Sequence, residues 1–212
     1  MEIAPGIFYE KNGGGTYLLK EGSRGTVIDP GWRAGRVEAL MQEAGVEGLR
    51  LILVTHPDWD HSWAAHNLRE RYGAPICAHS FNGTVDQPIS PGETLPVRSG
   101  LQVIGTPGHT VADVSFYLEH EHVLFSGDAL QNKGGWLVYA PFLFNVDHRN
   151  ARKSYHALLK IPFGLLCPGH REPIWRQDAR VRGEYAAMAL PLFDPDSPAP
   201  KIEELISAGP RR

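Results

Sequence analysis

The sequence predicts an α/β sandwich in which two similar halves each place strands inside and helices outside. Apolar runs of strand length alternate along the chain with segments whose apolar residues recur at helical spacing. The 23 glycines and 17 prolines among 212 residues exceed the roughly 12% of an average protein. Many tight turns should therefore connect these elements, and the length suits one domain.

The first half is predicted to be a strand meander followed by helices and two further strands. Gly-rich stretches separate the meander strands, and Gly45 supplies a stop for the first helix. The run at 51–54 is apolar throughout, which is typical of a central strand. Strands are expected at 6–10, 16–20, 25–28, 51–54 and 74–78, and helices at 36–44 and from 61 or 62 to 71.

The second half repeats this pattern and ends in a Pro-rich stretch. A hairpin turn is expected near 120–122. Strands are expected at 101–105, 114–118, 123–125 and 164–167, and helices at 149–160, 174–190 and 201–207. We expect one domain over residues 1–190 and a Pro-rich arm over residues 191–212.

Composition and charge exclude several classes of function. The net charge of −3 argues against a nucleic-acid partner, since such proteins usually show a clustered basic excess. No apolar window reaches the 18 residues of a membrane span, and the first residues lack the pattern of a signal peptide. We therefore expect a cytoplasmic protein with a small-molecule substrate and no membrane partner. Cys77 and Cys167 are too few for a disulfide framework and should be small buried residues.

Four loops carry the residues that indicate chemistry, and each directly follows a predicted strand. They are His56-Pro57-Asp58-Trp59-Asp60-His61, Gly108-His109, Gly127-Asp128 and Gly169-His170. Imidazole and carboxylate together suit zinc, manganese or iron rather than calcium. Three clustered aspartates would repel one another without cations, which favours a metal-loaded site.

This series resembles the metallo-β-lactamase superfamily, whose hallmark is a His-x-His-x-Asp-His loop followed by a lone His, a bridging Asp and a final His. The resemblance runs from the turn at Asp29 to His170 and implies a four-layer αββα sandwich, similar to a single-domain relative of glyoxalase II. It also implies a two-metal site. One ion would be held by His56, Asp58 and His109, the other by Asp60, His61 and His170, with Asp128 bridging. Asp29 would orient a ligand histidine, or would merely begin a turn before Pro30.

The sequence departs from the family pattern at Asp58, where the family usually has histidine. If Asp58 binds metal, the site becomes richer in oxygen and tilts from zinc toward iron or manganese. If its shorter side chain does not reach, His56, His109 and Asp128 remain, which is the two-His-one-carboxylate set of mononuclear iron oxygenases. Both alternatives stay open at this point.

The leading hypothesis is a hydrolase in which a metal-bound hydroxide cleaves an ester, thioester, lactone or phosphoester of a small molecule. Asp60 would be the catalytic residue that aims the hydroxide, and two divalent ions, zinc in first place, would be the cofactors. Only residues 171–212 follow His170, so we expect the helical domain with which glyoxalase II holds glutathione to be absent or reduced. The alternatives are an iron-dependent oxidoreductase, similar to persulfide dioxygenases or flavodiiron proteins, and a non-catalytic metal-binding module with a degenerate site.

Residues that bind the substrate are not identified by any motif. Lys133 and Arg171 flank the metal loops and are weak candidates for holding an anionic group. The apolar segment 134–144 is expected to line a substrate pocket, to form a subunit contact or to fold under the core, so a homodimer stays open.

Overall fold

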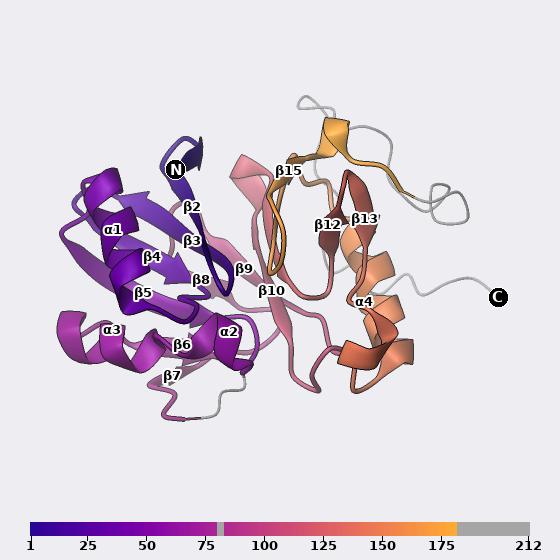
Figure 1. Cartoon of the computed structure of the whole chain (residues 1–212), viewed down its shortest axis with the longest axis horizontal. Helices are drawn as coiled ribbons and strands as arrows, with labels where there is room; N and C mark the ends of the chain where they lie inside the picture. The colour runs from indigo at the N-terminus through magenta and orange to yellow at the C-terminus, as the bar shows by residue number, and fades with distance from the viewer. Residues whose placement is uncertain (80–82, 182–212) are drawn as a thin grey trace.

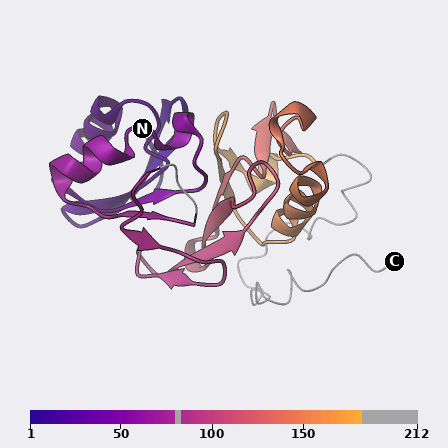
Figure 2. The same ribbon diagram turned by 90° about the horizontal axis from the view of Figure 1, so that it is seen from below.

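Two β-sheets lie face to face, and helices cover their outer faces (Figure 1). The computed structural model describes residues 1–79 and 83–181. In the orthogonal view the helices of the first half and α4 lie on opposite outer sides (Figure 2). The predicted α/β sandwich with the αββα arrangement is therefore confirmed.

The first sheet has seven strands in the order of the chain, antiparallel from β1 to β4 and parallel from β4 to β7. Its strands are β1 (Glu2–Ala4), β2 (Ile7–Asn12), β3 (Gly14–Glu21), β4 (Arg24–Ile28), β5 (Gly48–Val54), β6 (Ile76–Ala78) and β7 (Gln87–Pro88). Its helices are α1 (Ala34–Ala44), α2 (Trp59–Ser62) and α3 (Ala65–Tyr72). The strand predicted to be central, β5, lies between β4 and β6.

The second sheet has six strands in the order β15-β14-β11-β10-β9-β8, and only the pair β11 and β14 is parallel. Its strands are β8 (Thr94–Leu95), β9 (Leu101–Gly105), β10 (Val114–Leu118), β11 (Val123–Gly127), β14 (Leu165–Pro168) and β15 (Ile174–Trp175). A hairpin of β12 (Gln131–Lys133) and β13 (Trp136–Val138) stands apart, and α4 spans His148–Leu159. Short 3₁₀ turns are η1 (Glu119–Glu121), η2 (Phe142–Phe144) and η3 (Arg176–Asp178).

Alternation along the strands distributes the apolar side chains among three cores. In β10, Phe116 faces the opposite sheet while Tyr117 faces the outer layer. In β5, Leu53 points inward and Ile52 packs under the helices of the first half. Because both faces of the sheet are covered, the end of β5 at residues 51–54 reads as a continuous apolar run. Cys77 and Cys167 are free and buried in the central core, as predicted.

The predicted helix from residue 61 or 62 to 71 is two helices, so that prediction was wrong at its start. Helix α2 begins at Trp59, because the carbonyl of Asp58 accepts hydrogen bonds from the backbone N–H groups of His61 and Ser62. It ends early, because the N–H of Ala64 donates to the carbonyl of Gly31 at 2.8 Å. This tertiary contact separates α2 from α3 and attaches α2 to the turn that follows β4.

The predicted helix 174–190 is wrong over the residues that the structure describes. Ile174–Trp175 forms strand β15 against β14, with Leu166 opposite Ile174, and a short 3₁₀ turn follows. Pairing with the sheet edge overrode the local helical pattern. The rest of that helix, the predicted helix 201–207 and the Pro-rich arm 191–212 lie outside the described residues. Within 1–79 and 83–181, no helix combines the length and the apolar character needed to cross a bilayer.

Candidate metal centre

The four predicted loops meet at one edge of the sandwich, between the two sheets. Strand β5 leads into His56, α2 carries Asp60 and His61, and β11 and β14 lead into Asp128 and His170. Strands β4 and β5 are parallel and so are β11 and β14, so their carboxyl ends share an edge. The loop with His109 leaves the same edge, because β9 runs antiparallel to β10 and β10 antiparallel to β11.

Hydrogen bonds between the two halves hold this edge together. The backbone N–H of Val114 donates to the carbonyl of Thr55 at 2.9 Å, next to His56. The N–H of Gly15 donates to the carbonyl of Gly169 at 2.6 Å, next to His170. Each bond links a loop of one sheet to the other sheet. The relative position of the ligand-type residues is therefore set by the packing of the two sheets.

One group of potential ligands consists of His56, Asp58 and His109, whose nearest ligand atoms all lie within 4.8 Å of one another. The distance from Asp58 Oδ2 is 3.0 Å to His109 Nε2 and 3.9 Å to His56 Nε2. Asp58 therefore reaches the two imidazoles despite its short side chain. This geometry supports the first of the two alternatives for Asp58, an oxygen-rich ligand group.

A second group consists of Asp60, His61 and His170, again with ligand atoms within 4.8 Å of one another. Asp60 Oδ2 is 3.2 Å from His170 Nε2 and 3.9 Å from His61 Nε2, and the two Nε2 atoms are 3.4 Å apart. Nitrogen and carboxylate oxygen at such mutual distances are a donor set suited to a divalent transition metal.

Asp128 lies between the two groups. Its Oδ2 is 3.6 Å from His109 Nε2 and 3.5 Å from His170 Nε2, and its Oδ1 is 3.7 Å from His61 Nε2. One carboxylate thus faces histidines of both groups. This is the position that the sequence prediction assigned to a bridging residue.

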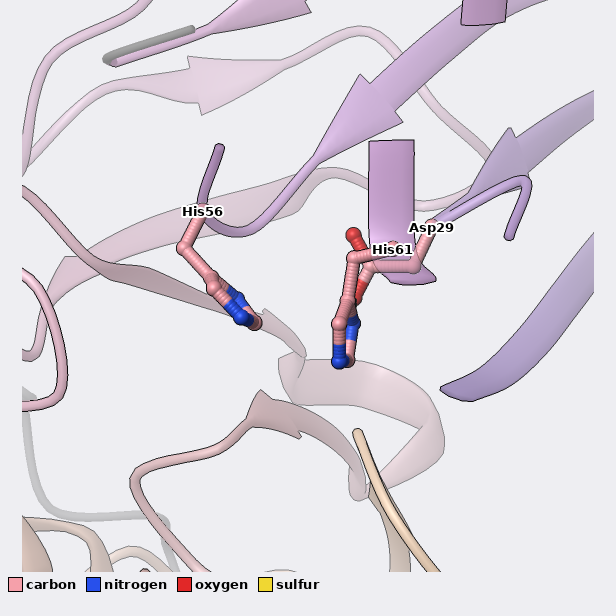
Figure 3. A group of neighbouring side chains, drawn as sticks. All are labelled: Asp29, His56 and His61. Atoms are coloured by element: carbon pink, nitrogen blue, oxygen red, sulfur yellow. The ribbon is translucent and has the colours of Figure 1, made fainter. Parts of the chain in front are cut away.

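Asp29 lies beside His61 (Figure 3), and together with Thr55 it orients the histidines. The Asp29 carboxylate accepts hydrogen bonds from Thr55 N at 2.8 Å, Thr55 Oγ1 at 2.7 Å and His61 Nδ1 at 2.9 Å. Since the Thr55 hydroxyl donates to Asp29, it accepts from His56 Nδ1 at 2.9 Å. Both imidazoles therefore carry a proton on Nδ1 and direct Nε2 toward the cluster.

Charges in the cluster shift the pKa values in opposite directions. Burial, followed by the neighbouring imidazoles of His61 and His109, lowers the pKa of His56. Burial also acts to lower the pKa of His61, but the carboxylates of Asp29, Asp128 and Asp60 outweigh it and raise that pKa to about 9. The hydrogen bond to Asp60 raises the pKa of His170. Without a metal, the carboxylates thus favour the protonated forms of His61 and His170.

Buried polar atoms without partners provide a test of whether the residues fit a metal. Among the described residues, His56 Nε2 and Asp128 Oδ1 are buried and lack a hydrogen-bond partner. Such atoms are rare in folded proteins, because each costs roughly 1–3 kcal/mol. Both belong to the cluster, and both are lone-pair donors that a cation would satisfy. The donor set therefore fits bound divalent metal ions.

Two glycines permit a close approach of backbone to this cluster. A Cβ at Gly14 would lie 2.8 Å from both the carbonyl oxygen of Gly169 and Cε1 of His61. A Cβ at Gly169 would lie 2.5 Å from Asp128 Oδ1. Sequence reasoning assigned the run at 13–15 to a turn, but Gly14 and Gly15 belong to β3 and lie against the ligand loops. The run of three glycines was the sequence feature that could have indicated this close approach.

A cavity of about 530 Å³ opens beside the cluster, and its lining includes residues that sequence reasoning missed. Besides five ligand-type residues, the lining includes Tyr9, Lys11, Trp32, Trp59, Gln131, Ala140, Pro141, Phe144 and Arg171. Arg171 belongs to the lining of this cavity, whereas Lys133 does not. The segment 134–144 has two roles, since Leu137 is buried in the core while Ala140, Pro141 and Phe144 line the cavity.

Asp113 is a further buried carboxyl group that sequence reasoning missed. It is 5% exposed and accepts hydrogen bonds from the backbone N–H and the hydroxyl of Thr110. Burial outweighs these bonds and raises the pKa of Asp113 to about 6. Together with the bond from Thr106 N to the Asp113 carbonyl, these contacts shape the loop that carries His109.

Fold, donor set and sequence agree on the class of protein. A sequence model of the metallo-β-lactamase superfamily matches residues 12–92 and 80–170. The chain belongs to the metallo-β-lactamase superfamily.

Individual relatives are similar over part of their length. A hydroxyacylglutathione hydrolase of Methylobacillus flagellatus is 33% identical over 138 residues, which cover 63% of this chain and 53% of that protein. Among the first curated relatives, the match spans 36% to 66% of their length. The crystal structure of TTHA1623 in a di-iron-bound form superposes with a TM-score of 0.68 at 27% identity, covering 80% of this chain and 94% of that chain. The crystal structure of BLEG-1, a B3 metallo-β-lactamase, superposes with a TM-score of 0.69 at 21% identity, covering 81% of this chain and 95% of that chain. The two proteins therefore share the fold.

Proposed function

We propose that the chain is a metal-dependent hydrolase that cleaves a small ester or thioester, with lactones and phosphoesters as further candidates. The observation that carries the proposal is the position of Asp128, within 3.7 Å of histidines from both ligand groups. A shared carboxylate between two groups of three donors supports a two-metal arrangement. The similarity to a hydroxyacylglutathione hydrolase favours the thioester.

Two divalent ions would be held by His56, Asp58 and His109 and by Asp60, His61 and His170, with Asp128 between them. Bound there, they would polarise the scissile bond and lower the pKa of water. Asp60 lines the cavity, and its carboxylate would accept a hydrogen bond from the attacking water and direct it. The water oxygen adds to the carbonyl carbon, and the bond to the leaving oxygen or sulfur breaks, which releases an acid and an alcohol or thiol.

Two basic side chains in the cavity lining would receive an anionic part of the substrate. Lys11 and Arg171 are exposed at the cavity, and neither forms an ion pair with any residue in 1–79 or 83–181. An unpaired cation beside a pocket can bind a carboxylate without breaking an existing contact. This extends the weak sequence-based expectation for Arg171 and replaces Lys133 with Lys11.

The test combines metal analysis with turnover. Purified protein is analysed for zinc, iron and manganese, then assayed against a panel of thioesters, esters, lactones and phosphoesters before and after chelation. We expect close to two ions per chain and activity that chelation abolishes and added metal restores. His61→Ala and His170→Ala should each remove about one ion and lower turnover by more than about 100-fold, beyond the usual effect of losing an outer partner. His120→Ala, at an exposed position, is the matched control.

A second candidate function is an iron-dependent oxidoreductase, and Asp58 is the observation that favours it. A carboxylate in place of the usual histidine makes one group richer in oxygen, which shifts preference toward iron or manganese. The di-iron form of TTHA1623 supports iron as a candidate metal. Iron in the purified protein together with oxygen consumption on a thiol substrate would favour this function. Stoichiometric zinc with hydrolysis would favour the first, and full activity without any metal would refute both.

A further inference from the structure

Two tryptophans form a stacked pair at the mouth of the cavity. The rings of Trp32 and Trp59 are parallel within 5°, with centroids 4.9 Å apart. Trp32 is 42% exposed and Trp59 is 62% exposed, and both line the cavity that holds the ligand groups. Exposed aromatic surface beside a pocket is typical of a place where a ligand binds. The pair is therefore unlike the buried aromatic residues of the three cores.

Backbone contacts of neighbouring elements position this pair. The backbone N–H of Trp32 donates to the Asn12 carbonyl at 3.0 Å. On the other side, the Trp32 ring lies against the backbone of Gly13, where a Cβ would come within 2.8 Å of Cδ1 and Nε1. Trp59 begins helix α2. A tryptophan side chain has few rotatable bonds, so it loses little conformational entropy when a ligand binds to it.

The position of the pair relates it to the reaction site. Trp59 lies between Asp58 and Asp60 in the sequence, so the pair adjoins both ligand groups. Pro141 and Phe144 belong to the same cavity lining and come from the other half of the chain. The cavity therefore has apolar surface from both halves beside the cluster, while Lys11 and Arg171 supply its positive charge.

We infer that Trp32 and Trp59 bind a flat, aromatic group of the substrate by stacking, next to the bond that is cleaved. This inference rests on the proposed hydrolase and names its substrate class, aryl-bearing acyl esters or thioesters. A planar ring extends the existing stack, whereas a saturated ring of equal size buries similar apolar area but cannot stack. The pair thus selects for ring planarity and not only for hydrophobicity.

Binding is tested on the purified protein with two neutral, slowly cleaved amides. They are 2-naphthylacetamide and its saturated analogue, decahydro-2-naphthylacetamide. Dissociation constants are measured by ligand-observed NMR titration for the natural sequence, for Trp32→Leu, for Trp59→Leu and for the double variant. We expect tighter binding of the planar amide and a loss of that preference by about 2- to 12-fold in the variants, as expected for a stacking contact.

Controls separate stacking from indirect effects. Trp59→Phe retains a ring and should keep most of the preference. Trp63 is 68% exposed and lines a neighbouring cavity of about 470 Å³, but it does not line the cavity beside the metal cluster. Trp63→Leu should therefore leave the preference for the planar amide unchanged. Metal content is measured for every variant, because Trp59 lies between two ligand-type residues. Equal affinity for the two amides, or a preference that survives the double variant with its metal retained, would overturn the inference.

A kinetic arm distinguishes this inference from the proposed function. N-acetylcysteamine thioesters of the two corresponding acids are compared by the ratio of their kcat/KM values, which cancels the common thiol leaving group. A ratio that favours the planar acid and falls in the tryptophan variants supports the substrate class. Hydrolysis of both thioesters with an unchanged ratio refutes the stacking role and leaves the hydrolase standing. Selective amide binding without hydrolysis of these thioesters or of any ester, lactone or phosphoester in the panel refutes the hydrolase and retains the aromatic site.

Discussion

Replacing Asp29 by Asn should weaken metal binding while leaving the fold intact. The Asp29 carboxylate accepts three hydrogen bonds, from Thr55 N, Thr55 Oγ1 and His61 Nδ1. Asparagine has the same shape but offers one acceptor oxygen and one NH₂ donor. With the oxygen kept on Thr55 N, the NH₂ group faces His61 Nδ1. His61 must then carry its proton on Nε2, the atom that faces the metal cluster.

The magnitude follows from the partner that is lost. Outer partners of ligand histidines typically contribute 10- to 100-fold to metal affinity, which corresponds to about 1.4–2.8 kcal/mol. We expect this loss for the ion held with Asp60, His61 and His170, and a smaller one for the other ion. The free energy of unfolding of the metal-free protein should fall by only about 1–2 kcal/mol, because asparagine keeps the shape of the side chain and the bond from Thr55 N, and its NH₂ group can donate to the other two partners in reversed hydrogen bonds.

The assay is a competition titration of each variant against a chelator of known affinity, with unfolding in urea as the check on the fold. Thr55→Val offers a contrast, because it removes the partner of His56 Nδ1 and keeps the bond between His61 and Asp29. Thr55→Val should weaken metal binding by the group with His56 more than metal binding by the group with His61. Asp86→Asn, on an exposed carboxylate paired with Arg69, is the neutral control. Unchanged affinity for both ions in Asp29→Asn would refute the orienting role.

Three further predictions concern close packing, the unusual ligand and pH. Gly14→Ala should destabilise the fold by about 1–3 kcal/mol and lower the metal content, because its Cβ would lie 2.8 Å from Gly169 O. The control is Gly35→Ala, where the Cβ meets open space. Unfolding in urea and metal analysis should show neither effect for this control. Asp58→His should raise the zinc-to-iron ratio of protein loaded from an equimolar mixture, and an unchanged ratio would show that Asp58 does not bind metal. For Asp113, whose pKa is raised to about 6, the folded state holds a proton that the unfolded chain releases near pH 4. Chelated protein should therefore lose stability as pH rises from about 4 to 6, on the order of 3 kcal/mol, and Asp113→Asn should flatten that slope in denaturant titrations.

The main strands were predictable because their side chains alternate between two buried faces. Runs such as Leu51 to Val54 are apolar on both sides, and turn residues bound them. The strands β1, β7, β8, β12 and β13 were missed, since each has only two or three residues and lies at an edge or in a hairpin. The helix predicted from residue 174 was wrong because its first residues pair with β14. Local pattern carries no information about which sheet edge is vacant.

For the candidate site, too, some features were predictable from the sequence and others were not. The residue types and their order along four loops suffice to predict which histidines and aspartates gather, because parallel strands end at a common edge. Whether Asp58 reaches His109, which nitrogen of His61 faces the cluster and which side chains line the cavity depend on distances of a few tenths of an ångström. Such distances arise only when the two sheets pack.

The α/β fold class, the four loops with ligand-type residues and the departure at Asp58 can be read from the residues alone, since they follow from spacing and residue chemistry along one chain. The reach of Asp128 to both ligand groups, the bond from His61 Nδ1 to Asp29 and the stacking of Trp32 on Trp59 become visible only in the folded chain. These contacts join residues from separate elements. Their geometry depends on how the sheets and helices pack, which local sequence patterns do not specify.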